Sequence, residues 1–125
     1  MTEEGLVLIS STIKTISIIE FINILNKFKW EDINIEISAM PRKDIKNSCV
    51  IKLDKIPKNI KDIINSFITP IESISVLGSI KNCNISITAL IEDELLKWME
   101  ITVQSENKES AKEMIAELAQ YFKKN

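Results

Sequence analysis

The chain has 125 residues, of which 45% are hydrophobic and 27% are charged, and its formal net charge is −2. This composition is that of one globular domain, residues 1–125, with enough length to bury a core. The sequence has no histidine and only two glycines, which excludes histidine-based catalysis, histidine metal ligands and glycine-rich phosphate loops.

Residues 5–10 are mostly apolar and predict either a short buried strand or an extended lead-in to a helix. Ser11 and Thr12 then offer N-cap oxygens for a helix that runs to about residue 29. Apolar residues recur along it at steps of three and four, as at Ile16, Ile19 and Ile22. Because β-branched isoleucines lower helix propensity, part of 13–19 is alternatively a strand.

Strict alternation of apolar and polar residues over 33–40 and again over 49–54 predicts a hairpin with a long polar connection at 41–47. Pro57 and Pro70 then bracket a helix that has an isoleucine- and phenylalanine-rich face.

Three further strands, 73–80, 84–91 and 97–104, are predicted from the same period of two, with turns at 81–82 and 92–94. The chain closes with a helix over about 107–123, in which the apolar positions follow the i, i+3, i+4, i+7 rule.

The predicted order is therefore an optional strand, a helix, two strands, a helix, three strands and a helix. Strands with one apolar face and helices with one apolar stripe bury both only against each other. We expect an α+β two-layer sandwich, with a mostly antiparallel sheet of five or six strands, helices packed on it, and one face left in water.

The charge is unevenly distributed. Residues 42–61 contain seven basic and two acidic side chains, a net charge of +5, while both flanks are acidic. A phosphate-binding surface is one interpretation. Without aromatic residues to stack on bases, and with a sequence pI of about 5.3, solvated lysines are the better interpretation, and we expect no nucleic-acid partner.

Few residues offer other chemistry. The acidic residues 92–94 either hold a hard cation or form a solvated turn, and a turn is the simpler reading, so no metal or cofactor is expected. Cys49 and Cys83 fit no metal or disulfide pattern, so we expect free thiols, which suits a reducing cytoplasm. No segment approaches the roughly 20 apolar residues that span a bilayer, and no membrane partner is expected.

A candidate binding surface lies on the sheet face that points away from the helices. Alternation places apolar side chains there among serines, threonines and Glu36, and exposed tryptophans are enriched at binding hot spots. The predicted partner-binding residues are Trp98, Leu77, Leu90, Met40 and Val50. The other possibility is that the first strand or helix covers this face.

The order of elements resembles that of roadblock-type dimerisation domains, in which a five-stranded sheet lies between helices and pairs with a second copy. In size and charge the chain also resembles immunity proteins, which block partner toxins. We therefore expect a non-catalytic protein-binding domain, either a self-associating scaffold, possible as a homodimer, or a specific inhibitor. A small enzyme or ligand-binding domain, with a pocket between sheet and helices, is the alternative.

Overall fold

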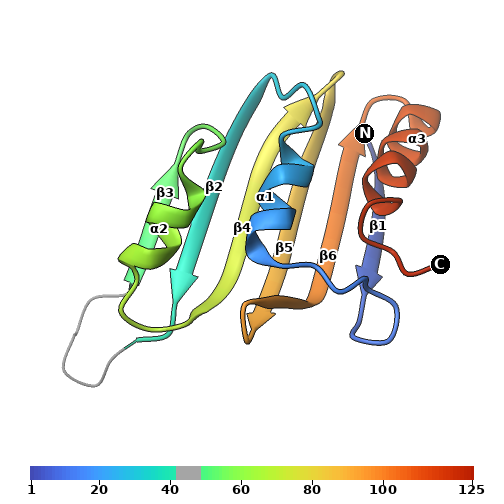
Figure 1. Ribbon diagram of the computed structural model, residues 1–125. Helices are drawn as coiled ribbons and strands as arrows, with labels where there is room; N and C mark the ends of the chain where they lie inside the picture. The colour runs from blue at the N-terminus through green and yellow to red at the C-terminus, as the bar shows by residue number, and fades with distance from the viewer. Residues whose placement is uncertain (42–48) are drawn as a thin grey trace.

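The computed structural model describes residues 1–41 and 49–125, which form one six-stranded antiparallel sheet and three helices (Figure 1). In chain order the elements are β1 (Thr2–Leu8), α1 (Ile18–Leu25), β2 (Asp32–Ala39), β3 (Cys49–Leu53), α2 (Ile60–Ser66), β4 (Ile71–Ile80), β5 (Cys83–Glu92), β6 (Leu95–Ser105) and α3 (Lys108–Ala119). This order confirms the predicted α+β class, including the optional first strand.

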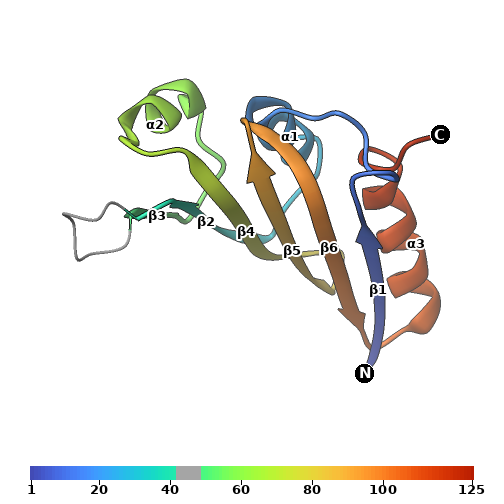
Figure 2. The same cartoon turned by 90° about the horizontal axis from the view of Figure 1, so that it is seen from below.

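The helices lie together on one face of the sheet, and the sheet twists strongly beneath them (Figure 2). Inward-facing residues of neighbouring strands form apolar rows across the sheet. One such row joins Ile37, Ile74, Ala89 and Met99, each fully buried. The two-layer sandwich is thus confirmed, whereas the helices on both sides that the roadblock likeness implies are not found among the described residues.

The strand order is β1-β6-β5-β4-β2-β3. The hairpin of β2 and β3 and the meander of β4, β5 and β6 both form as their alternation predicts. β2 pairs with β4 although β3 and α2 intervene in the chain, and this pairing joins the hairpin to the meander. Because such a pairing depends on residues far apart in the sequence, it is visible only in the folded chain.

The two turns of the meander are tight. Lys81 and Asn82 have φ angles of 49° and 64°, and Asp93 and Glu94 have 54° and 66°. Two successive left-handed residues are the geometry of two-residue hairpins whose twist matches that of the strands. The turns predicted at 81–82 and 92–94 are confirmed.

β1 is an edge strand, and it pairs with β6 so that Thr2 lies opposite Ser105 and Leu8 opposite Met99. Of the two possibilities for the apolar run near the N-terminus, the strand is correct. Its side chains alternate between partly buried and exposed, and only Leu8 is fully buried, because α3 covers one face of the edge and solvent the other.

α1 begins at Ile18, later than the predicted start at Ser11 or Thr12. Ser17 is the N-cap: its hydroxyl accepts a hydrogen bond from the Glu20 amide at 3.1 Å, and the Glu20 carboxylate accepts one from the Ser17 amide at 3.3 Å. The preceding residues are extended or turned, and Ile13 forms a β-bridge with Lys123. The predicted helix was therefore too long at its start, because the isoleucine-rich lead-in favours extended backbone.

The other two helices are also shorter than predicted. α2 occupies only the middle of the segment between the two prolines, and its cap Asn59 makes no side-chain capping bond. α3 is capped as expected by Asn107, whose side chain accepts hydrogen bonds from the amides of Glu109 and Ser110. None of the helices in the described segments is long and apolar enough to cross a membrane.

Aromatic side chains join α1 to the C-terminal segment. The rings of Phe21 and Phe122 are both fully buried, with their centroids 5.7 Å apart. Backbone bonds reinforce the contact, since the Lys14 amide donates to the Phe122 carbonyl and the Lys124 amide to the Thr12 carbonyl. The inward-facing side chains of β5 and β6 are buried throughout, whereas those of the edge strand β3, namely Cys49, Ile51 and Leu53, are only partly buried.

Candidate functional site

The outer face of the sheet is the side that carries no helix (Figure 2), and the strand registers place four cross-strand rows of side chains on it. Within the described residues no helix or loop covers it. Hydroxyl groups from four strands dominate its centre, and they belong to Ser38, Ser73, Ser75, Ser86, Thr88 and Thr102.

One row contains most of the apolar residues on this face. Trp98 of β6 lies directly opposite Leu90 of β5, and the row continues through Ser73 and Ser38 to Val50. Leu90 is 46% exposed and Trp98 is partly buried. Directly opposed side chains in an antiparallel pair lie within contact distance, so the structure brings Trp98 and Leu90 together as one apolar pair.

The other three predicted residues lie apart from this pair. Val50 is three strands away from Leu90 in the same row, about 14 Å at the usual strand spacing. Leu77 belongs to a different row, opposite Ser86 and Asn34, and is 58% exposed. Met40 follows the end of β2 and its amide donates to the Pro70 carbonyl. All five are exposed or partly buried, but they do not form one continuous patch.

The charged residues of the outer face are mostly acidic. Glu36 and Glu100 occupy one row, with Lys52 beside Glu36. Another row ends in Glu3, which accepts a hydrogen bond from Gln104, and in Asp32, which accepts one from Ser79. These two rows together carry four carboxylates and one ammonium group, so their net charge is negative.

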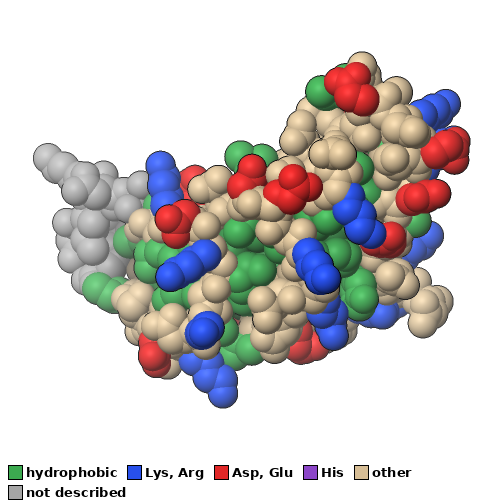
Figure 3. Space-filling view, turned by 90° about the horizontal axis from the view of Figure 1, so that it is seen from above, with side chains coloured by type: hydrophobic (Ala, Val, Ile, Leu, Met, Phe, Trp, Pro, Cys, Tyr) green, Lys and Arg blue, Asp and Glu red, His purple; other side chains and the backbone are tan. Residues whose placement is uncertain are grey.

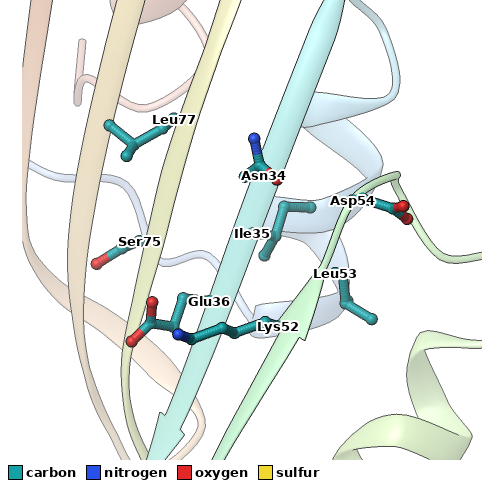
Figure 4. Close-up of a pocket in the computed structure, with 8 residues that line it drawn as sticks. All are labelled: Asn34, Ile35, Glu36, Lys52, Leu53, Asp54, Ser75 and Leu77. Atoms are coloured by element: carbon teal, nitrogen blue, oxygen red, sulfur yellow. The ribbon is translucent and has the colours of Figure 1, made fainter.

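A shallow hollow occupies the β3 side of the outer face (Figure 4). Its volume is about 430 Å³, and the side chains that line it are mostly polar. Leu77 is at one end, Asn34 and Ser75 line the middle, and Glu36 and Lys52 extend across the strands. Glu36 and Lys52 therefore supply opposite charges from neighbouring strands, which can hydrogen-bond to a partner. They do not form a nucleophile–base pair.

A second concave region lies in the helical layer and was not predicted from the sequence. Two adjoining hollows, of about 240 and 570 Å³, share Ile18, Ile64, Asn65 and Glu94 in their walls. We call them together the α1–α2 groove. It is bounded by the start of α1, by α2 and the segment after it, and by the β5–β6 turn (Figure 1).

The walls of the α1–α2 groove are apolar, and its rim is acidic. Ile64 and Phe67 are partly buried, and Ile68 is 73% exposed. Asp93 and Glu94 line the larger hollow from the β5–β6 turn. One feature of the sequence indicates this groove: Phe67 and Ile68 are adjacent at the end of a short helix, and one helix face cannot bury both.

The remaining sequence candidates are placed as follows. Cys83 is 1% exposed at the start of β5, with its thiol 3.8 Å from the Ser110 carbonyl, whereas Cys49 is partly exposed. No group of three or more carboxylates and thiols able to hold a metal is found in residues 1–41 and 49–125.

The basic segment divides between the two layers. Lys52 is on the outer face, and Lys61 lies in α2, while Arg42, Lys43 and Lys46 are outside the described residues. At the end of the molecule shown in Figure 3, basic side chains are scattered among hydrophobic and acidic ones and form no single basic patch on the described surface.

Comparison with known proteins gives little further information. No protein-family model matches the chain, and no curated protein matches it. Among solved structures, a conserved hypothetical protein from Pyrococcus furiosus is similar, with 14% sequence identity and a TM-score of 0.36 over 96% of this chain and 90% of that chain.

Proposed function

We propose that this chain is a non-catalytic protein-binding domain that presents the outer face of its sheet to a basic protein partner. The observation that carries the proposal is the Trp98–Leu90 pair, which lies on a face that the helices leave open. A large aromatic side chain with an apolar neighbour, surrounded by hydroxyl groups, has the composition of an interface anchor with a polar rim.

Charge favours a different protein over a second copy. If two copies paired through their outer faces, the acidic residues of one copy would face those of the other. These residues are Glu3, Asp32, Glu36 and Glu100. Like charges brought together at an interface are unfavourable. A basic surface would instead complement them. A specific inhibitor, as the immunity-protein likeness implies, is therefore favoured over the self-associating scaffold. Two free cysteines favour the cytoplasm as its location.

The first test is the molar mass in solution, measured by light scattering against the 14.3 kDa chain. The proposal expects a monomer. A stable dimer that becomes monomeric on Trp98→Ala would show that the outer face binds a second copy. The chain would then be a self-associating scaffold and not an inhibitor.

The second test requires a partner obtained by cross-linking in the source cell and then purified. Its affinity, measured by calorimetry, is expected to fall by about 30-fold or more with Trp98→Ala, as for a hot-spot residue. The affinity is also expected to weaken as salt is raised from about 0.05 to 0.5 M, because exposed charges are screened. Ile68→Ala is the matched control, since Ile68 is exposed in the helical layer. Equal losses with both variants, or none with Trp98→Ala, would contradict the proposal.

A small enzyme or ligand-binding domain remains the second candidate, and the α1–α2 groove favours its ligand-binding form. The groove is a concave region of the helical layer, and the residues that line it come from α1, α2, the segment after α2 and the β5–β6 turn. Its larger hollow offers carboxylates and apolar walls but no nucleophile with an adjacent base.

A further inference from the structure

The α1–α2 groove has the size of a small-molecule site. Its larger hollow, of about 570 Å³, falls within the roughly 300–1,000 Å³ typical of ligand pockets. The smaller hollow extends it along α1, past Ser17 and Ile19. Ligand sites of this kind combine apolar walls with a few fixed polar groups, and both are present here.

Some of the apolar side chains that line the α1–α2 groove stay exposed to solvent in the folded chain. Ile18 and Ile71 are buried at the base of the larger hollow, Ile64 and Phe67 are partly buried beside them, and Ile68 is exposed. α2 is only seven residues long, and Phe67 and Ile68 follow it directly, so the apolar surface continues beyond the end of the helix. An apolar ligand body laid against Ile64, Phe67 and Ile68 would remove that surface from water.

The charged groups that line the larger hollow are both anionic, and both belong to one tight turn. Asp93 and Glu94 occupy the two left-handed positions of the β5–β6 turn. The Glu94 carbonyl accepts a hydrogen bond from the Ile18 amide at 3.3 Å, which ties the turn to the start of α1. Among the described residues, no basic side chain lines the larger hollow, and Lys61 lines only the smaller one.

We propose that the α1–α2 groove binds an amphiphilic cation, a small ligand whose apolar body lies against Ile64, Phe67 and Ile68 and whose positive charge faces Asp93 and Glu94. The charge complementarity is specific to the larger hollow, because the part of the chain that the structure describes places two carboxylates and no cation in its walls. This site lies in the helical layer and does not depend on the function proposed for the outer face.

The test uses n-octylammonium and octanoate at pH 7, two probes of equal chain length and opposite charge, each below its micelle concentration. Amide chemical shifts are followed by NMR. We expect saturable shifts in residues 64–71 and 93–95, with octylammonium binding at least about fivefold more tightly, because two carboxylates attract the cation and repel the anion.

Three variants separate charge from packing. Asp93→Asn with Glu94→Gln is expected to bring the two dissociation constants to within about twofold of each other. Glu92→Gln is the matched control, because Glu92 belongs to the same acidic run but lines neither hollow, and it should leave the preference unchanged. Ile68→Ser should weaken both probes equally.

Four results would overturn the proposal: no saturable shifts at these amides, equal affinities for the two probes, a charge preference that survives the double substitution, or Ile68→Ser without effect. The amide spectrum of each variant shows at the same time whether the fold is intact, so a loss of binding is not confused with unfolding.

Discussion

The indole ring of Trp30 lies directly against Gly78. A Cβ placed on Gly78 would come within 2.7 Å of Cε3 of Trp30 and 2.6 Å of the Asp32 carbonyl oxygen. Trp30 is fixed at its other end, since its ring N–H donates to the Leu25 carbonyl at 2.8 Å. The side chain therefore connects the end of α1 to the middle of the sheet, and the missing side chain at 78 makes room for it.

Gly78→Ala is accordingly expected to destabilise the fold by about 1–3 kcal/mol, the usual cost of overpacking, as measured by urea denaturation. Gly5→Ala is the control. Its Cβ would meet only the Ile101 carbonyl oxygen at 4.0 Å, so stability should stay level or rise by less than about 1 kcal/mol. Equal effects of the two substitutions would show that Trp30 does not pack on Gly78.

Substitution of the two candidate N-cap residues tests where α1 begins. Ser17→Ala removes the capping hydroxyl and should cost about 1 kcal/mol in the free energy of unfolding. Ser11→Ala, at an exposed residue well before the helix, should change it by less than about 0.5 kcal/mol. A larger loss at Ser11 would mean that the helix begins earlier.

The two cysteines should differ in reactivity. Under native conditions a thiol reagent such as a disulfide-exchange chromophore should modify Cys49, which is partly exposed, and leave Cys83, which is 1% exposed, until the chain unfolds. Cys49→Ser and Cys83→Ser identify which thiol reacts. Rapid modification of Cys83 in folded protein would show that the contact between β5 and α3 opens readily.

Trp98 and Met99 are neighbours in the chain but belong to opposite faces of β6. Trp98→Ala should lower stability by about 1 kcal/mol or less, because Trp98 is only partly buried and lies opposite Leu90 on the outer face. Met99→Ala should cost about 2–5 kcal/mol, since Met99 is fully buried. Thermal and denaturant unfolding measure both. A cost at Trp98 similar to that at Met99 would place Trp98 in a core and remove the main support for the outer-face interface.

Periodicity predicted the strands well, because a period of two follows directly from burying one face of a sheet. The same alternation correctly assigned Val76 and Ile87 to the helical side and Leu77 to the other. It could not show that Leu77 and Leu90 lie in separate rows, because the register between strands is a property of the pairing and not of either strand alone.

The errors have a common cause in non-local contacts. Of the two predictions for the segment before α1, the helix start at Ser11 or Thr12 is wrong and extended backbone within 13–19 is correct, since Ile13 and Ser17 form bridges with Lys123 and Leu95. The α1–α2 groove was missed for the same reason, since the residues around Ile64 and around Glu94 meet only through the folded sheet. The local hydrophobic periodicity indicates which faces of the helices and strands are apolar. It does not indicate which distant segment of the chain packs against them.

The pairing of β1 with β6 affects the order in which the sheet can be assembled during synthesis. Thr2 lies opposite Ser105, so β1 leaves the ribosome about 100 residues before the strand with which it pairs. Until β6 is available, Leu6 and Leu8 have no partner strand and are exposed to non-native contacts. Contacts of such long sequence separation form slowly, and we infer that docking of the N-terminal strand is a late step of folding.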